Sequence, residues 1–271
     1  MNQASSDTSM LRHEFATHRF LGQSFVSADD DKLLAFIRTR ADSPQFSYIV
    51  TPNTDHIVKI DRLSRSELGP ALEAAYESAD IRLCDSRILA LLARLSGIDL
   101  RVVTGSDLTR RLFEDDIVLP GDNVGLIGGT ARQLAWLRAY RPEVQFHGYV
   151  PPPGVLHNRL AQTEIAEFVE QTPCNFYFFA FGAPQSELVA AQIKRGMQAR
   201  GVALCIGASI EFLSGAKPRA PIWVQRLCLE WLYRLIREPR RLARRYLIEG
   251  PRILLLWQRE HAAIRRTGNR R

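Results

Sequence analysis

The chain has 271 residues, of which 46% are apolar and 24% are charged, a composition typical of a globular protein and not of a disordered one. This length is enough for one α/β domain with an additional segment. The first seventeen residues lack the apolar core of a signal peptide. No window approaches the roughly 20 apolar residues that cross a bilayer. We therefore expect neither export nor a transmembrane span.

The positive charge is concentrated near the C-terminus. Residues 217–271 contain fifteen Lys and Arg against four Asp and Glu, a net charge of +11, which leaves −4 for residues 1–216 of a chain whose total is +7. Trp223, Trp231 and Tyr246 lie among these basic residues. Basic and aromatic side chains together are typical of a segment that lies on an anionic membrane surface. The same combination suits binding of a lipid or sugar pyrophosphate.

The order of predicted elements indicates the fold class. Residues 1–18 are predicted to be disordered. After them, apolar runs typical of strands alternate with helical patterns. The predicted strands are 46–50, 81–83, 124–127, 144–149, 176–181 and 202–206, and the predicted helices are 55–63, 67–78, 86–95, a helix that ends at 140, 164–170 and 185–200. This alternation predicts an α/β domain over residues 19–216, with a mostly parallel, Rossmann-like sheet and helices on both faces.

From Lys217 onward the pattern is helical only, and we call residues 217–271 the C-terminal appendage. Polar residues recur every three or four positions opposite an apolar stripe that includes Trp223 and Trp231. Pro239 is expected to end the first helix and begin the next, and Gly250-Pro251 to end that one. The sequence therefore predicts two or three short basic helices packed beside the sheet domain.

Neither cysteines nor acidic clusters indicate a metal site. The four cysteines have no CxxC spacing and are expected to be free thiols, and the six histidines are scattered. Asp29-Asp30-Asp31 resembles a metal-binding DxD sequence, but it follows Ser27 and precedes an apolar run, so helix capping is the favoured interpretation. Glu114-Asp115-Asp116 is expected to be a solvated turn. No metal or other cofactor is expected.

Polar or glycine-rich residues follow four of the predicted strands, where ligands bind to parallel sheets. The first is Thr51-Pro52-Asn53, which is either a helix cap or a substrate contact. Asp85 follows the second of these strands, 81–83, and is either a helix cap or a catalytic base. Gly128-Gly129 suits phosphate contact through backbone N–H groups, although it lacks GxGxxG spacing. Gly182-Ala183-Pro184 ends the most apolar strand and is either a turn or part of the site.

Together these segments resemble the WecG/TagA/CpsF family of bacterial glycosyltransferases over about residues 20–257. The matching residues are Thr51-Pro52-Asn53, Asp55-His56, Asp85, Gly105-Ser106-Asp107-Leu108, Gly128-Gly129, His147-Gly148-Tyr149, Gly182-Ala183-Pro184, Glu187, Ile206-Gly207-Ala208-Ser209, Phe212, Gly215, Arg219-Ala220-Pro221, Glu230-Trp231, Arg234, Glu238-Pro239-Arg240-Arg241 and Arg245-Tyr246. Two positions depart from the family pattern. Cys84-Asp85-Ser86 stands where the family has Pro-Asp-Gly, and Gln185-Ser186 stands where it has Lys-Gln.

The resemblance implies an inverting transfer of a sugar from a UDP-sugar to a polyprenyl-diphosphate-linked sugar in cell-surface polysaccharide or exopolysaccharide synthesis, by a peripheral protein on the cytoplasmic face of the inner membrane. Asp85 is the implied general base, and Thr51 and Asn53 position the substrate. The implied substrate contacts are Gly105, Ser106, Asp107, Gly128, Gly129, Tyr149, Gly182, Pro184, Gln185, Glu187, Arg234, Arg241 and Arg244. The C-terminal appendage would complete the active site as well as bind the membrane. A homo-oligomer is compatible with the sequence.

Two functions of other classes remain as alternatives. An oxidoreductase with a nucleotide cofactor would use Gly128-Gly129, but no ribose-binding acid follows at the expected distance. A nucleic-acid-binding protein would use the arginines of the appendage, but the −4 body and the interleaved Trp and Leu favour a lipid surface, so no nucleic-acid partner is expected.

Overall fold

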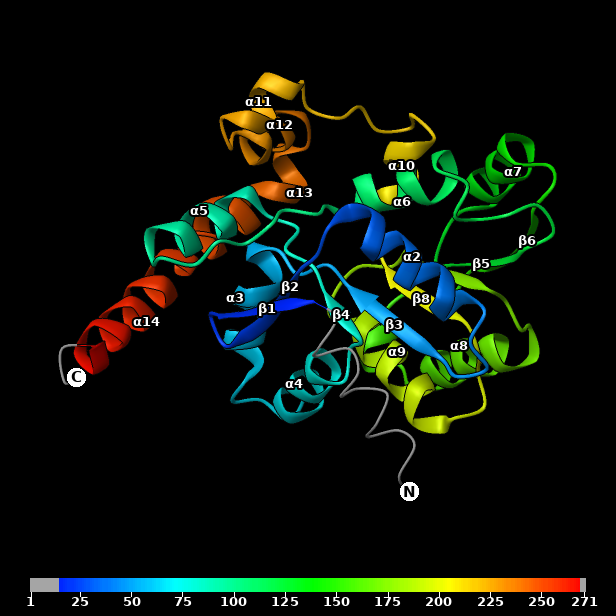
Figure 1. The fold of residues 1–271 in the computed structure, drawn as a ribbon, viewed down its shortest axis with the longest axis horizontal. Helices are drawn as coiled ribbons and strands as arrows, with labels where there is room; N and C mark the ends of the chain where they lie inside the picture. Colours follow the sequence, from blue (N-terminus) through cyan, green and yellow to red (C-terminus); the bar gives the residue numbers. More distant parts are fainter. Residues whose placement is uncertain (1–14, 269–271) are drawn as a thin grey trace.

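The computed structural model describes residues 15–268 and has a single six-stranded parallel sheet at its centre (Figure 1). In sheet order the strands are β4 (Ile81–Arg82), β3 (Ser47–Val50), β8 (Val202–Cys205), β7 (Phe176–Phe179), β5 (Asn123–Ile127) and β6 (Gln145–Tyr149). All six were predicted from sequence, and every pairing between neighbours is parallel. The predicted α/β class is therefore confirmed.

Helices cover both faces of the sheet because successive strand residues point to opposite sides. One face carries Ile49, Phe176 and Phe178, which pack with α2 (Asp30–Ala41), α6 (Gly105–Glu114), α7 (Ala131–Tyr140) and α10 (Ser209–Leu213). The other face carries Tyr48 and Tyr177, which pack with α4 (Gly69–Glu77), α8 (Arg159–Gln171) and α9 (Gln185–Gly196). In Figure 1, α2, α6 and α10 lie above the sheet, and α4, α8 and α9 lie below it. A 3₁₀ turn, η1 (Val155–His157), precedes α8.

Side-chain caps fix the start of several helices that follow strands, by accepting bonds from free backbone N–H groups. Asn53 caps α3 (Thr54–Leu63), and Ser86 caps α5 (Arg87–Leu95). Thr104 caps α6, and Thr130 forms a capping box with Gln133 at α7. Each cap follows a strand or bridge at the carboxyl edge of the sheet, so these local signals place helix N-termini around one common edge.

An antiparallel hairpin that the sequence did not predict precedes the sheet. It consists of β1 (Ala16–Phe20) and β2 (Gln23–Ser27), so β1 begins inside the segment expected to be disordered. Residues 1–14 of that segment lie outside the described residues. Phe20 and Phe25 of the hairpin are fully buried in a third core, with Ile57, Leu89 and Ile253.

The C-terminal appendage is helical, as predicted, with more segments than expected. It comprises α11 (Ile222–Arg226), α12 (Glu230–Arg237), α13 (Pro239–Ala243), the π-helix η2 (Arg244–Glu249) and α14 (Arg252–Gly268). Pro239 begins α13 and Pro251 separates η2 from α14, which confirms both predicted breaks. Figure 1 shows α11–α13 beyond the end of the sheet and α14 alongside α5. Within residues 15–268, no helix combines the length and apolarity needed to span a bilayer.

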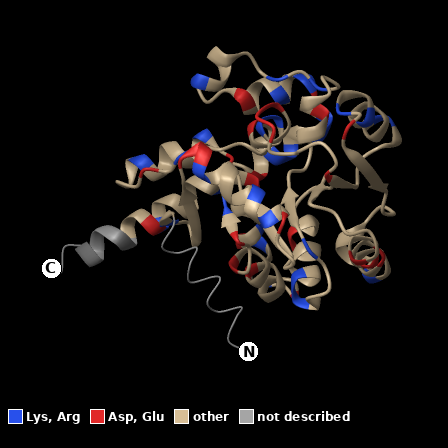
Figure 2. Ribbon diagram, turned by 45° about the vertical axis from the view of Figure 1, so that its right-hand side comes forward, with Lys and Arg blue, Asp and Glu red and all other residues tan. Residues whose placement is uncertain are grey.

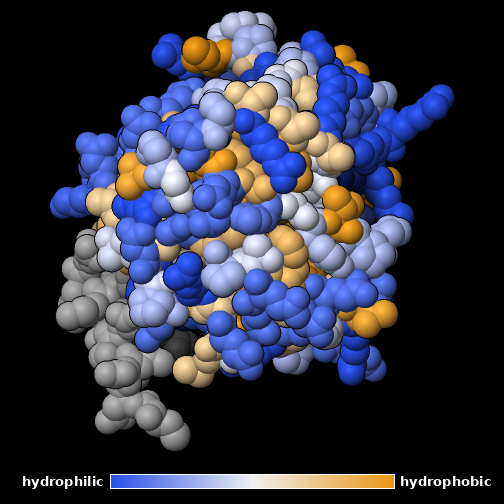
Figure 3. Space-filling view, turned by 90° about the vertical axis from the view of Figure 1, so that its right-hand side faces the viewer, coloured by the Kyte–Doolittle hydropathy of each residue, from blue (hydrophilic) through white to orange (hydrophobic). Residues whose placement is uncertain are grey.

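Charged residues bridge the appendage and the sheet domain. Ion pairs join Arg219 to Asp107, Arg252 to Asp61 and Arg62 to Glu249, at 2.6–2.9 Å. Figure 2 shows blue and red segments side by side where the helices of the appendage meet the rest of the molecule. The face seen in Figure 3 is mainly hydrophilic, and its hydrophobic atoms occur in small separate patches.

Candidate active site

A cleft of about 440 Å³ lies at the carboxyl edge of the sheet, between the strand ends and the C-terminal appendage. The sheet domain contributes residues that follow β3, β4, β5, β7 and β8, and the appendage contributes residues of α12, α13 and η2. The lining includes Thr51, Asn53, Asp85, Ser106, Gly128, Gly182, Glu187, Ser209, Arg234, Arg237, Arg241 and Arg245. This is the position at which parallel sheets bind ligands.

The surroundings of Asp85 raise the pKa of its carboxylate. Its backbone N–H donates to the Pro52 carbonyl at 3.0 Å, which holds the segment after β4 against the segment after β3. Burial raises the pKa of Asp85 to about 7, and the opposing effects of Arg234 and of a hydrogen bond from the Gly105 backbone do not offset it. At physiological pH, a carboxylate with a pKa near neutrality is deprotonated in a large fraction of molecules and is basic enough to accept a proton.

Gly105 allows two polar side chains, those of Ser209 and Thr51, to lie near Asp85. A Cβ atom at this position would lie 3.2 Å from Ser209 Oγ, 3.3 Å from Thr51 Oγ1 and 3.8 Å from Asp85 Oδ2. Thr51 is buried, and its hydroxyl donates to the Cys205 carbonyl at 3.3 Å. Gly105 itself does not line the cleft, and its backbone forms a hydrogen bond to Asp85.

Asn53 has two roles that the sequence left as alternatives. Its side-chain oxygen accepts from the backbone N–H groups of Asp55 and His56, at 3.0 and 3.4 Å, so it caps α3. The same side chain lines the cleft. The capping prediction is confirmed, and the geometry is compatible with a substrate contact as well.

Behind Asn53, Asp55 joins the sheet domain to the appendage. Its carboxylate lies 2.8 Å from Lys59 Nζ and 3.2 Å from Arg245 Nε. Burial alone would raise the pKa of Asp55, but Arg245 and Lys59 outweigh it and hold that pKa below its usual value. The ionised Asp55 thus places Arg245 at the cleft wall.

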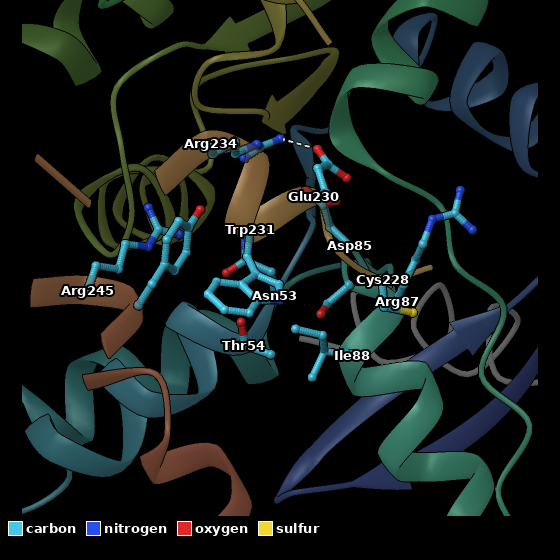
Figure 4. A pocket seen from close by; sticks show the side chains of 12 residues that line it. Asn53, Thr54, Asp85, Arg87, Ile88, Cys228, Glu230, Trp231, Arg234 and Arg245 are labelled. Atoms are coloured by element: carbon cyan, nitrogen blue, oxygen red, sulfur yellow. Dashed lines mark hydrogen bonds and ion pairs between the residues drawn. The ribbon is translucent and has the colours of Figure 1, made fainter. Parts of the chain in front are cut away.

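A second, smaller cavity of about 100 Å³ meets the first at Asp85 (Figure 4). Both cavities are lined by Asn53, Asp85, Arg234, Arg245 and Tyr246. The smaller one adds Thr54, Ser86, Arg87, Ile88, Cys228, Glu230 and Trp231. In Figure 4, Trp231 and Ile88 lie on opposite sides of this space, and Arg234 is bonded to Glu230 at 2.6 Å. Asp85 therefore lies at the junction of two spaces of different composition.

The arginines that reach the cleft differ partly from those predicted. Arg234 and Arg241 line it, as expected. Arg244 does not line either cavity, because its side chain is 77% exposed and lies 3.2 Å from Glu249. Arg245 lines both cavities, and Arg237 lines the larger one. The two arginines differ in their partners, since Arg245 pairs with Asp55 of the sheet domain at 3.2 Å and Arg244 pairs with Glu249 of its own segment, η2.

Several other predicted contacts lie outside the cleft lining. Asp107 receives bonds from Arg219 at 2.6 and 3.1 Å and from Thr104 at 2.7 Å, so it anchors the start of the appendage. The Tyr149 hydroxyl donates to Glu164 at 2.9 Å. Gly129 is required by packing, since a Cβ there would come within 2.5 Å of Leu126. Pro184, which follows a cis peptide bond, and Gln185 lie next to lining residues without lining the cleft themselves.

Ser186 and Glu187 form a buried polar pair in the cleft wall. The Ser186 hydroxyl donates to Glu187 Oε2 at 2.9 Å, and both residues are at most 2% exposed. Burial raises the pKa of Glu187 to about 7. Ser186 is one of the departures from the family pattern, so a short hydroxyl stands where a longer amide is usual. At the other departure, Ser86 caps α5 through its hydroxyl, which accepts from Leu89 N–H at 3.2 Å.

Asp29 is the cap of α2, as predicted. Its carboxylate accepts from Asp31 N–H at 3.0 Å, while Asp30 pairs with Arg101 and Arg111 at 2.9 Å. Across residues 15–268, no group of three His, Cys, Asp or Glu side chains is arranged to hold a metal ion. Cys84, Cys174, Cys205 and Cys228 are free thiols.

Comparison with known proteins identifies the class of enzyme to which this protein belongs. Two curated relatives are each named N-acetylglucosaminyldiphosphoundecaprenol N-acetyl-beta-D-mannosaminyltransferase. The one from Bacillus spizizenii is 27% identical over 221 residues, covering 78% of this chain and 81% of the relative. The one from Bacillus subtilis is 28% identical over 169 residues, covering 60% of this chain and 62% of the relative. The protein is a glycosyltransferase.

The particular family follows from a match that covers most of the chain. Residues 18–267 match the Glycosyl transferase WecG/TagA/CpsF family, and the chain belongs to that family. The resemblance inferred from the strand-end residues and the appendage is therefore confirmed, and the oxidoreductase and nucleic-acid-binding alternatives are set aside.

Proposed function

We propose that this glycosyltransferase moves a sugar from a UDP-sugar to a polyprenyl-diphosphate-linked sugar, with inversion, during synthesis of a cell-surface polysaccharide. The observation that supports this most directly is the position of Asp85, with a pKa of about 7, at the junction of two cavities. A transferase that acts by single displacement needs a base between a donor space and an acceptor space.

The step uses groups that meet at this junction. The acceptor hydroxyl oxygen attacks the anomeric carbon of the donor and forms the new glycosidic bond, while Asp85 takes the hydroxyl proton. The bond from the anomeric carbon to the UDP oxygen breaks, and UDP leaves with the electron pair. Attack from the side opposite the leaving group inverts the configuration of the anomeric carbon. Thr51 and Asn53 hold the substrate beside Asp85.

The leaving diphosphate carries negative charge that must be balanced as the bond breaks. Arg234, Arg237, Arg241 and Arg245 line the larger cavity and provide this balance from the appendage. Arginine suits the task because it stays charged and grips phosphate oxygens with two N–H groups. We therefore propose catalysis without a metal ion or other cofactor.

The appendage also carries the features expected of a membrane-binding surface. Its exposed apolar side chains are Ile222, Trp223, Leu227, Leu232, Ile236, Leu247, Ile248, Leu254 and Leu255, which lie among arginines. Such a surface binds to anionic headgroups and the outer edge of the acyl region. We propose that residues 217–271 form a unit that holds the protein peripherally on the cytoplasmic face of the inner membrane, where prenyl-linked acceptors are found.

The function is tested by product formation. The protein is incubated with a panel of UDP-sugars and an N-acetylglucosaminyl diphosphate on a prenyl chain, and products are identified by mass spectrometry. The panel begins with UDP-N-acetylmannosamine because the relatives' names specify that transfer. We expect one disaccharide product of inverted configuration, formed equally well with a chelator present. Absence of transfer from every UDP-sugar would contradict the proposal, and loss of activity in chelator that magnesium restores would contradict its metal-free part.

A further inference from the structure

Helix α5 of the sheet domain is apolar on two sides, but only one of them is covered. Leu89, Leu92 and Ala93 face the third core and are at most 5% exposed. Ile88, Leu91 and Leu95 recur at spacings of three and four residues, so they form a second stripe along the helix, of which Ile88 is partly buried against the third core. Leu91 is 44% exposed and Leu95 is 58% exposed. A helix with apolar residues on an uncovered side has surface available for a ligand.

This second stripe begins at the candidate site. Ile88 lines the smaller cavity, and Asp85 lies three residues before it in the sequence. From Ile88 the stripe runs away from the site over seven residues, which is about 10 Å at the rise of an α-helix. The α5 stripe (Ile88, Leu91 and Leu95) is thus continuous with the space that contains the proposed base.

A cation that is available to a ligand lies where the stripe starts. Arg87 lines the smaller cavity, and within the described part of the chain its guanidinium has no hydrogen-bond or ion-pair partner. Figure 4 shows its side chain extended without a contact to the other labelled residues. By contrast, Arg234 is paired with Glu230, and Arg245 with Asp55. Arg87 therefore has its full charge available for an anionic group.

The residue after the far end of α5 is hydrogen-bonded to the appendage. Ser96, the residue after α5, accepts a hydrogen bond from Trp257 Nε1 of α14 at 2.9 Å. On α14, Leu254 and Leu255 are 48% and 55% exposed. Exposed apolar side chains thus occur on α5 and on the helix packed beside it.

We infer that α5 binds the lipid part of the acceptor: Arg87 binds the diphosphate, and the α5 stripe carries the first isoprene units of the prenyl chain towards the membrane. This rests on the proposed function. The order of groups along α5 matches the order along such an acceptor. Asp85 lies at the sugar hydroxyl, Arg87 binds the diphosphate, and the α5 stripe contacts the prenyl chain. The smaller cavity is then the acceptor side of the site, and the larger cleft is the donor side.

A photo-crosslinking experiment tests binding independently of catalysis. The probe is N-acetylglucosaminyl diphosphate on a farnesyl-length chain that carries a diazirine in its second isoprene unit. Trypsin cleaves after Arg87, Arg94 and Arg101, so the α5 stripe is divided between the peptides 88–94 and 95–101. We expect one or both of these two peptides to carry the label, and to lose it when unlabelled prenyl diphosphate competes. Label confined to peptides of α11–α14, or to any other part of the surface, would overturn the inference.

A kinetic experiment separates the stripe from Arg87. Two acceptors share one sugar diphosphate and differ only in carrying a prenyl or a methyl group. The variant Leu91→Gln/Leu95→Gln should raise KM for the prenyl acceptor roughly 10-fold and leave the methyl acceptor unchanged, because only the prenyl chain covers the stripe. The matched control Leu119→Gln/Leu160→Gln, at leucines that are 42% and 67% exposed elsewhere, should change neither.

Arg87→Gln should raise KM for both acceptors roughly 10-fold, with KM for the UDP-sugar unchanged, since both acceptors carry the diphosphate. If the leucine variant affects both acceptors equally or neither, the α5 stripe does not bind the chain. If Arg87→Gln acts on KM for the UDP-sugar instead, the assignment of the two cavities is wrong. A wild-type protein that transfers to neither acceptor would refute the proposed function, while the crosslinking result would still decide the role of α5.

Discussion

The sheet domain and the C-terminal appendage contribute to one cleft but are built differently. The four inner strands of the central sheet, β3, β8, β7 and β5, are almost entirely buried, and two large cores fix the positions of their ends. In the appendage, α12 and η2 have no buried residue, and α11 and α13 each have one. The base comes from the first region and the arginines from the second. The proposed reaction therefore depends on how stably the weakly buried C-terminal appendage packs on the sheet domain.

The docking contacts explain what holds the two regions together. Ion pairs that are partly exposed contribute up to about 1 kcal/mol each. The buried strands of the sheet domain gain far more from removing apolar surface from water. The appendage is therefore expected to open more readily than the sheet unfolds, and variants of each region should fail in different ways.

The largest effect is expected at Asp85, in the rigid region. Asp85→Asn should lower kcat about 10²–10⁴-fold, the range for loss of a general base, and should leave folding intact. In the wild type, kcat/KM should rise with pH up to about 7 as Asp85 loses its proton. Steady-state kinetics from pH 5 to 9 and circular dichroism measure both. Near-normal turnover of the variant at saturating substrate would show that Asp85 is not the base.

Neighbouring arginines of the appendage provide the next comparison. Arg245→Gln should lower kcat/KM by about 10–100-fold, because it removes a charged group from the cleft and leaves Asp55 with Lys59 alone. Arg244→Gln is the matched control, since its side chain lies outside the cleft. It should stay within about 2-fold of wild type in an assay with a short-chain acceptor. The opposite ranking would show that Arg244, and not Arg245, acts on the substrate.

A smaller effect separates capping from catalysis at Asn53. Asn53→Ala should lose about 1 kcal/mol of stability with the cap of α3, and should also lower kcat. Asp29→Ala removes the cap of α2, far from the cleft, and should cost similar stability with unchanged kcat. Denaturant unfolding and turnover are measured for both. Equal activity in the two variants would reduce Asn53 to a cap.

The smallest effect concerns Glu187 and pH. Burial raises its folded pKa to about 7, above its unfolded value, so the folded state keeps a proton that the unfolded state releases. Its contribution to stability is present in acid and is lost as pH rises through about 7. When the pH rises from 6 to 8, the unfolding free energy of the wild type should fall by about 1 kcal/mol more than that of Glu187→Gln. Parallel urea titrations at the two pH values would show it.

Local sequence signals predicted the sheet well, and they predicted which polar residues meet at its carboxyl edge. The four inner strands are short, mainly apolar runs, and the polar residues after β3 and β4 lie together because parallel strands end at one edge. The hairpin of β1 and β2 was missed for a physical reason. Its turn has Leu21 and Gly22 at φ of 50° and 75°, and leucine is not a residue that signals such a turn. The turn is instead held by Glu260, whose carboxylate oxygens accept from Leu21 N–H at 2.8–2.9 Å.

Sequence patterns also do not show the tertiary contacts that surround several predicted site residues. The prediction of Arg244 rests on the family resemblance and on its spacing from Arg234 and Arg241, and nothing in the sequence indicates that Arg245 pairs with Asp55. Asp107 was assigned to the substrate, yet its partner is Arg219, from a segment more than a hundred residues later. The smaller cavity was not anticipated either, since it forms only where α5 meets α12 and η2.

The contact between α14 and the N-terminal hairpin has a consequence for engineering the protein. Phe20 and Phe25 share a core with Ile253, and the hairpin turn is bonded to Glu260. A chain shortened at Gly215 would therefore expose two phenylalanines and free a strained turn at the opposite end of the sequence. A shortened enzyme intended for solution work should remove α11–η2 and retain α14 through a linker, or receive α14 back as a separate peptide. The β1–β2 hairpin and α14 stabilise each other, so removal of either one is expected to destabilise the other.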